Sequence, residues 1–250
     1  MLSSMLSEED FKIGSLSLSG KIGSLDMVEI KDRLPLLYSL DMGQCSYSDD
    51  AGSGLQGLDN RRFLERVILP ADLKSIGQSA FLCSAVKEVS FPSGLESIGD
   101  QAFSRCKYLT GISLPSDLKM MGRLCFDKCE GLTEITIPSG VSRIPDNAFD
   151  GCVNLSSVTI EGDVSEIGNY AFNECVGLRH ANLGNSLIAI GDYAFRECTS
   201  LSDIQFPASL VNIGQSAFYN DCSLKRIEIP HSVESIGKYA FFFIVRVPNS

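Results

Sequence analysis

A phenylalanine that follows a small residue recurs along this chain at an almost constant interval. Successive copies are separated by 22 residues once and by 23 residues thereafter. They are Phe81, Phe103, Phe126, Phe149, Phe172, Phe195, Phe218 and Phe241. A fixed period of this length is the sequence signature of a solenoid, in which each repeat buries its apolar edge only against its neighbours.

The residues around each phenylalanine follow a common frame. An isoleucine stands five positions earlier, except at Met121, and a glycine follows it, except at Pro145. Residues 132–137 alternate apolar and polar side chains at their end, which predicts a short half-buried strand that a proline then ends. The glycine suits a tight turn with unusual backbone angles, and the Ala-Phe pair predicts a core wedge. We expect a β-rich α/β solenoid of about eight repeats of 22–23 residues, stacked as a parallel sheet.

The first quarter of the chain lacks this frame but contains relatives of it. Residues 1–62 therefore predict an N-terminal cap, and residues 63–250 the solenoid, whose last repeat is incomplete. Within the cap we expect a strand, a short helix, a second strand and a loop, at residues 15–20, 24–34, 37–42 and 49–60.

The other end of the chain departs from the frame after Phe241. The next residues are Phe242, Phe243 and Ile244, and Ile244 stands where a cysteine is expected. Two interpretations follow: a shortened chain, or an exposed apolar end that pairs with a partner. The second interpretation predicts self-association through the C-terminal end.

The complete frame, I-G-x-x-A-F-x-x-C-x-x-L-x-x-I-x-[IF]-P, resembles the BspA-like leucine-rich repeats, also called Treponema pallidum-type repeats. The resemblance covers residues 63 to about 247. It implies a leucine-rich-repeat solenoid, and a family that is largely secreted or displayed on the cell surface. Where such proteins have a known role, the role is adhesion to host proteins, extracellular matrix or other bacteria. The family has no fixed functional motif, so the resemblance carries over only the structural frame.

Seven of the nine cysteines fall near one position of the frame. Five stand three residues after their phenylalanine, while Cys83 is one residue early and Cys222 one residue late. A metal array is disfavoured because no CxxC pair and no column of histidines accompany them. Disulfides between repeats are geometrically conceivable. We favour buried, nearly apolar core thiols that are free and slow to react.

Charge and motifs exclude several classes of function. The formal net charge is −10, whereas a nucleic-acid binder needs a basic surface. No stretch approaches the roughly 20 apolar residues that span a bilayer. There are two histidines, and no catalytic or phosphate-binding motif stands in its required context. We therefore expect no enzyme, no cofactor and no metal site.

The outward positions of the predicted strands are the best candidates for binding a ligand. Side chains two apart on a strand, repeated between rungs, form one continuous face. Its later part carries larger side chains of mixed charge. The candidate ligand-binding residues are His180, Asn182, Asp203, Gln205, Arg226 and Glu228. The alternative is that these residues form only the solvated side of the sheet.

The leading hypothesis is a non-enzymatic, adhesin-like interaction protein, secreted or on the cell surface, that binds a host, matrix or microbial protein through this face. The main alternative is an intracellular scaffold, favoured by unpaired cysteines and by the absence of an export signal in residues 1–10. A carbohydrate-binding module is disfavoured because the chain has no tryptophan to stack on sugar rings. A purely structural spacer is a further alternative.

Overall fold

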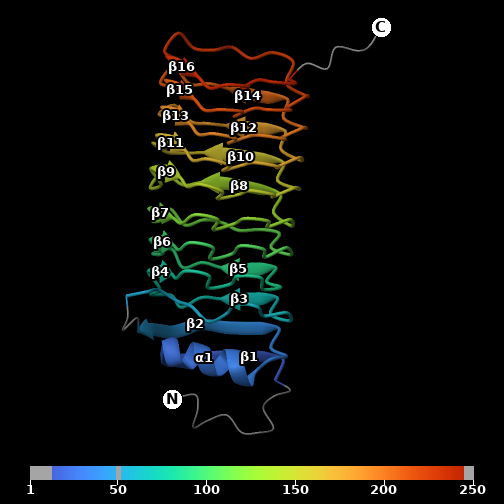
Figure 1. Cartoon of the computed structure of the whole chain (residues 1–250). Helices are drawn as coiled ribbons and strands as arrows, with labels where there is room; N and C mark the ends of the chain where they lie inside the picture. Colours follow the sequence, from blue (N-terminus) through green and yellow to red (C-terminus); the bar gives the residue numbers. More distant parts are fainter. Residues whose placement is uncertain (1–12, 49–51, 245–250) are drawn as a thin grey trace.

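The computed structural model describes residues 13–48 and 52–244. The chain winds into a stack of flat rungs, with the N-terminal residues at one end and the C-terminal residues at the other (Figure 1). The predicted solenoid of stacked repeats is confirmed. Residues 1–12, 49–51 and 245–250 lie outside the described part, and with them the segment 1–10 in which no export signal was expected, part of the loop at 49–60 and the end of the last repeat.

The predicted strands form a parallel ladder along the stack, divided into two sheets. In the N-terminal part the ladder runs through β1 (Ser15–Gly23), β2 (Ser39–Ser48), β3 (Arg66–Ile68) and β5 (Glu88–Ser90). In the C-terminal part it runs through β8 (Glu134–Ile137), β10 (Ser157–Ile160), β12 (His180–Asn182) and β14 (Asp203–Gln205). Equivalent residues pair one repeat apart, as Val158 does with Ala181 and Ala181 with Ile204.

A second parallel ladder runs beside the first and was not anticipated from the sequence. It is built from the isoleucine of the frame and the residue before it. Its strands are β4 (Ser75–Ile76), β6 (Ser97–Ile98), β7 (Met120–Met121), β9 (Arg143–Ile144), β11 (Glu166–Ile167), β13 (Ala189–Ile190), β15 (Asn212–Ile213) and β16 (Ser235–Ile236). The isoleucine points into the core in every one of these strands but β16, where Ile236 is exposed, and β7, which has Met121 in its place. The segment that the sequence indicated as a turn therefore begins with a two-residue strand.

Both ladders are interrupted between the same two rungs. In the second ladder, β7 and β9 belong to separate sheets within the described residues. Pro145 stands where other rungs have a glycine whose N–H donates to the preceding rung, as Gly122 does to the carbonyl of Ile98. Proline has no N–H to donate. In the first ladder, Gly111 makes one isolated bridge to Glu88, and β8 begins a new sheet.

The frame phenylalanines form a continuous column of stacked rings through the core. Neighbouring ring centroids from Phe81 to Phe241 are 4.8 to 5.5 Å apart. The seven rings from Phe81 to Phe218 are fully buried, and the widest spacing, 5.5 Å, separates Phe126 from Phe149. The predicted core wedge is thus a spine that crosses every repeat.

The frame glycine is required for a reason other than the one predicted. The glycines after the isoleucine do not adopt positive φ; instead they lie against the preceding rung. A Cβ on Gly122 would stand 2.3 Å from the backbone nitrogen of Asp100, and one on Gly237 would stand 2.4 Å from that of Gln215. The left-handed residues are instead those two before and two after each phenylalanine, such as Tyr170 (φ 57) and Glu174 (φ 56).

These left-handed residues align the backbone around each phenylalanine. Three N–H groups of every rung, at the phenylalanine and two residues to either side, donate to three carbonyls of the next rung. For the rung of Phe172 the donors are Tyr170, Phe172 and Glu174, at 2.7 to 2.9 Å. The same three bonds recur at each junction from Phe81 to Phe241, always donated toward the C-terminal end. The phenylalanine segments therefore form a third, polarised hydrogen-bond ladder.

The N-terminal region continues the solenoid. The predicted helix is present as α1 (Ser24–Arg33), which buries Met27 and Ile30. The strands that precede and follow it in the sequence, β1 and β2, pair with each other in parallel. The irregular segment before the first repeat is a degenerate rung, in which Leu58 takes the phenylalanine position and donates to Ala80. The buried guanidinium of Arg61 then donates to carbonyls at the end of α1, those of Ile30, Lys31 and Leu34.

Candidate binding surfaces

Four of the six predicted ligand-binding residues lie on adjacent strands and point to solvent. His180 pairs in register with Asp203, and Asn182 with Gln205, across β12 and β14. The residues between them, Ala181 and Ile204, point inward and are buried. Strand alternation therefore separates the core from the surface here as the sequence indicated.

Arg226 and Glu228 extend this surface but not the strand ladder. The prediction that they continue the ladder is wrong: in the described chain the ladder ends at β14, and residues 225–230 form no strand. Both side chains are exposed and pair with each other at 2.6 Å. We call the six residues the polar face: His180, Asn182, Asp203, Gln205, Arg226 and Glu228.

The polar face is hollowed at two adjoining places. One hollow of about 240 Å³ is lined by residues of β12 and β14, and another of about 390 Å³ by β14, Phe206, Arg226 and Glu228. Asp203 and Gln205 line both. The Nδ1 of His180 lies 3.6 Å from a carboxylate oxygen of Asp203, and both side chains are more than 60% exposed. Such side chains can exchange solvent for a partner's polar groups at little cost in stability.

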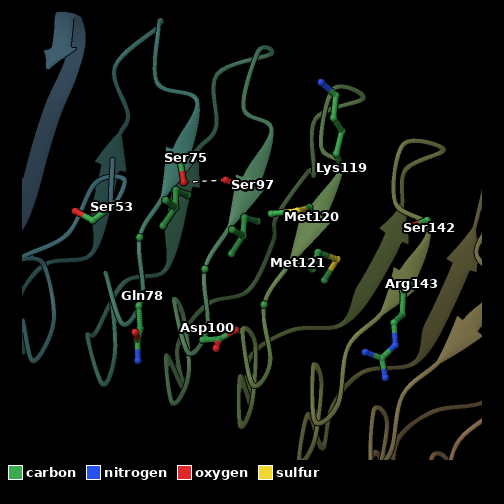
Figure 2. A pocket seen from close by; sticks show the side chains of 15 residues that line it. Ser53, Ser75, Gln78, Ser97, Asp100, Lys119, Met120, Met121, Ser142 and Arg143 are labelled. Atoms are coloured by element: carbon green, nitrogen blue, oxygen red, sulfur yellow. Dashed lines mark hydrogen bonds between the residues drawn. The ribbon is translucent and has the colours of Figure 1, made fainter. Parts of the chain in front are cut away.

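A groove that sequence reasoning missed lies along the second ladder in the N-terminal half. Its volume is about 410 Å³, and it runs over β4, β6 and β7 to Arg143 of β9 (Figure 2). The glycines at positions 77, 99 and 122 form part of its lining and contribute no side chain to it. The hydroxyls of Ser75 and Ser97 are hydrogen-bonded at 2.8 Å within it.

The groove crosses the interruption between β7 and β9 and ends at Ser142 and Arg143. Figure 2 shows Met120 and Lys119 on one part of the rim and Arg143 at the end. Met120 is 65% exposed, while Lys119 pairs with Glu96 at 2.8 Å. Two features of the sequence could have revealed the groove: the serines at positions 75 and 97, and Pro145 in place of the frame glycine. Neither could be interpreted, because the second ladder itself was not predicted.

The cysteine column contains five thiols rather than seven. Each donates to the carbonyl of the phenylalanine in the preceding rung at 3.0 to 3.2 Å, and all five are buried. They are Cys106, Cys129, Cys152, Cys175 and Cys198. Burial raises the pKa of the Cys106 thiol to about 12. A thiol held protonated is a poor nucleophile and a poor metal ligand.

The assignment of Cys83 and Cys222 to this column is wrong. Ser84 and Asp221 occupy the position instead, while Cys83 is exposed and Cys222 is half-buried. Asp221 is fully buried, and one of its carboxylate oxygens accepts the backbone N–H of Cys198 at 2.8 Å. The other oxygen has no hydrogen-bond partner. Burial raises the pKa of the Asp221 carboxyl well above its usual value.

Residues 13–48 and 52–244 contain no group of three potential metal ligands. No helix among them is long and apolar enough to cross a membrane.

The two strand ladders, the phenylalanine spine and the column of five buried thiols define a leucine-rich repeat protein. More particularly, the chain belongs to the BspA type leucine-rich repeat family. Six copies of that repeat match over residues 57–133 and 119–245. The match begins within the degenerate rung, in keeping with its hydrogen-bond pattern. No curated protein matches the chain.

Solved structures agree with this assignment. A leucine-rich repeat protein from Bacteroides ovatus is 24% identical, with a TM-score of 0.62, over 91% of this chain and 69% of its own. The T. pallidum leucine-rich repeat protein is 29% identical, with a TM-score of 0.57, over 60% and 70%. One from Eubacterium ventriosum is 20% identical, with a TM-score of 0.61, over 84% and 60%. These structures show the leucine-rich repeat fold, and the family match supports a protein-interaction repeat module.

Proposed function

We propose that this protein is an adhesin-like module, secreted or displayed on the cell surface, that binds a host, extracellular-matrix or microbial protein through the polar face. The observation that carries the proposal is that face itself. Exposed acidic, imidazole and amide side chains stand in register on the paired strands β12 and β14, and Arg226 and Glu228 pair with each other on the rung beyond them. These side chains surround two adjoining hollows, so a protein partner would meet both hydrogen-bonding groups and a recessed surface that its side chains can enter.

The rigidity of the scaffold supports this role. Four of the six polar-face residues stand on β12 and β14, whose inward side chains, Ala181 and Ile204, are buried in the core. A partner would therefore not have to order the surface before binding it, which lowers the entropic cost of association. The family's largely extracellular occurrence is the second support, and it bears on location rather than on the site.

The experiment for the site changes Asn182, Asp203, Gln205 and Arg226 together to alanine. The purified chain is offered two kinds of probe: surfaces coated with extracellular-matrix proteins, and intact neighbouring bacteria. Its attachment to each probe is measured. We expect attachment to be lost while the thermal unfolding midpoint is kept. The matched control changes Ser75 and Ser97, which line the groove on the second ladder. Unchanged attachment of the fourfold variant would refute the assignment of the polar face.

The experiment for location is protease treatment of intact cells that make the protein, followed by immunodetection. Loss of the chain with cytoplasmic markers intact is the expected result. Full protection, after controls for surface masking, would contradict the adhesin proposal.

That second outcome would favour an intracellular scaffold. One observation suits it: all nine cysteines are free, as a reducing compartment would keep them. Partners would then be sought by co-purification from the cytoplasm with the wild type and with the fourfold variant. A partner lost only with the variant would show that the polar face is the binding site even though the protein is intracellular.

A further inference from the structure

Two tyrosines on neighbouring rungs stack their rings on each other in the C-terminal half of the solenoid. The ring centroids of Tyr170 and Tyr193 are 4.7 Å apart, and the ring planes differ by 9°. Each tyrosine stands two residues before a frame phenylalanine, and both have a left-handed backbone, with φ of 57° and 58°. The same backbone conformation at the same position of successive rungs makes the Cα–Cβ bonds parallel, so one ring lies over the other.

The hydrogen-bond ladder of the phenylalanine segments holds the two tyrosines in this register. The N–H of Tyr170 donates to the carbonyl of Asp192 at 2.9 Å. The N–H of Phe172 donates to the carbonyl of Ala194 at 2.7 Å. Tyr193 stands between these two accepting residues, so neither tyrosine can move away from the other without breaking the ladder.

The stacked pair is flanked by residues that are not tyrosines, and it is open to solvent. The same position of the frame holds Asn147 on the rung before the pair and Ser216 on the rung after it. The hydroxyl oxygen of Tyr193 accepts a hydrogen bond from Nε2 of Gln215 at 2.7 Å, which leaves the hydroxyl proton available to water. Tyr170 is 37% exposed and Tyr193 is half-buried. Both phenols can therefore lose a proton to water and an electron to an oxidant at the surface.

Two phenols in this arrangement are suited to oxidative coupling. A phenol that loses one electron and one proton becomes a phenoxyl radical, whose unpaired electron lies partly on the ring carbons ortho to the oxygen. Two such radicals held in ring contact form a carbon–carbon bond faster than radicals that must first meet by diffusion. The torsion that turns a tyrosine ring has a broad energy minimum, so a modest tilt brings two of these carbons together.

We propose that Tyr170 and Tyr193 are a site of oxidative cross-linking, at which hydrogen peroxide and a haem peroxidase convert the stacked pair into a dityrosine. Each phenol gives up one electron and its hydroxyl proton, and a bond forms between one ortho carbon of each ring. The hydrogen on each of these carbons then moves as a proton to the oxygen of its own ring. One peroxide takes up the two electrons and the two hydroxyl protons and leaves as two waters.

The product would join two rungs of the solenoid covalently. They are the rungs that carry β12 and β14, since these strands begin eight residues after Phe172 and Phe195. Like a disulfide, a cross-link between residues 170 and 193 restricts the unfolded chain and so favours the folded state. Unlike a disulfide, it survives in a reducing environment. None of the six polar-face residues takes part, so the proposal does not depend on what that face binds.

The test treats the full chain with a haem peroxidase and hydrogen peroxide and follows the fluorescence of dityrosine. The monomer is then isolated under denaturing conditions and digested with trypsin. Trypsin cleaves after Arg179, so a link between the two tyrosines joins the peptides 144–179 and 180–196, each of which contains one tyrosine. We expect this joined pair in the monomer, lighter by two hydrogen atoms than the sum of the two peptides.

Three variants show which phenols react. Tyr170→Phe and Tyr193→Phe keep the ring and remove the phenol, so each alone should remove most of the dityrosine fluorescence of the monomer. The matched control is Tyr108→Phe, since Tyr108 is 59% exposed and stacks on no tyrosine in the described part of the chain. This control should leave the fluorescence and the joined peptides unchanged. Cys83→Ser is treated in parallel, because the exposed thiol can reduce a phenoxyl radical before it couples.

Unfolding in urea separates coupling that depends on the fold from random coupling. In urea the two tyrosines are no longer held together, so the yield of the joined pair should fall to that of other tyrosine pairs. Any one of three outcomes would overturn the proposal. They are the absence of the joined pair from both the wild type and Cys83→Ser, an equal yield in urea, and monomer fluorescence that Tyr170→Phe does not lower. After refolding, the cross-linked monomer should unfold at a higher urea concentration than the untreated chain, and an unchanged midpoint would contradict the stabilising effect.

Discussion

The thiol of Cys152 donates a hydrogen bond to the backbone carbonyl of Phe126, 26 residues earlier, at 3.1 Å. The bond joins two rungs from beneath the turn, at a carbonyl that points into the core. A cysteine fits because it is small and largely apolar and still carries one weak donor. The same relationship holds at the four other positions of the column.

This arrangement predicts slow thiol chemistry in the folded protein. Only the thiolate reacts readily, and burial raises the pKa values of the column thiols, for Cys106 to about 12. In a titration with a chromogenic disulfide near pH 8, we expect Cys83 to react first, Cys222 more slowly, and the column only on unfolding. Cys83→Ser should remove the fast phase. Fast labelling of more than two thiols in the native state would contradict the column.

The buried carboxyl of Asp221 predicts a stability that falls as pH rises. Its pKa in the folded state is well above its usual value, so the folded chain holds this proton more tightly than the unfolded chain does. Its contribution is therefore most favourable below the ordinary carboxyl pKa and is lost as pH rises through the raised value. Asp221→Asn keeps the acceptor for the N–H of Cys198 and removes the charge.

At neutral pH we expect Asp221→Asn to stabilise the protein by about 1–3 kcal/mol, the scale of an unsatisfied buried polar group. Urea unfolding at a series of pH values measures it. Asp203→Asn, on the exposed polar face, is the control and should change little. Equal effects of the two variants at every pH would show that burial of Asp221 is not the cause.

Close approach of rungs at the frame glycine predicts that even a methyl group is costly there. A Cβ on Gly122 would stand 2.3 Å from backbone, whereas one on Gly111 would meet nothing within 4 Å. We expect Gly122→Ala to destabilise by about 1–3 kcal/mol, as overpacking does. Gly111→Ala should change stability by about half a kcal/mol or less. Unfolding midpoints compare the two, and similar losses would argue against steric contact.

The phenylalanine spine predicts a large loss on truncation in the interior. Phe149 is fully buried and stacks on rings from both neighbouring rungs. We expect Phe149→Ala to cost about 3–5 kcal/mol. Thr159→Ala on the outward side of β10 should cost about half a kcal/mol or less. Denaturant unfolding of both variants, followed by circular dichroism, would reveal whether the column or the sheet surface carries the stability.

Much of this fold could be predicted from periodicity, because a rung repeated eight times fixes both the strand and the inward side chains. Isoleucine and phenylalanine at constant intervals must face one core. What periodicity could not reveal was the second ladder. A two-residue strand leaves no alternation to detect, and it exists only because the neighbouring rungs supply its hydrogen bonds.

The column of thiols shows a similar limit. Counting placed Cys83 and Cys222 near the right position, but the chain path around the turn sets which side chain points inward. Ser84 and Asp221 hold that place. The polar face was predicted more easily, since outward positions of a strand follow from its inward ones. Whether the face binds a partner depends on chemistry that repetition alone does not encode, and it stays a prediction.

The shared interruption of both ladders divides the stack into two blocks. Across this interruption, the backbone N–H groups of Leu124, Phe126 and Lys128 donate to the next rung, and the thiol of Cys152 donates back to the carbonyl of Phe126. The rings of Phe126 and Phe149 also stack there, at the widest centroid spacing of the spine. In a linear array each rung draws its stability from its neighbours, so a weak junction lowers the cooperativity between the parts on either side. Under heat or a pulling force, the solenoid should open first at this seam. The N-terminal block would then melt separately from the C-terminal block that carries the polar face.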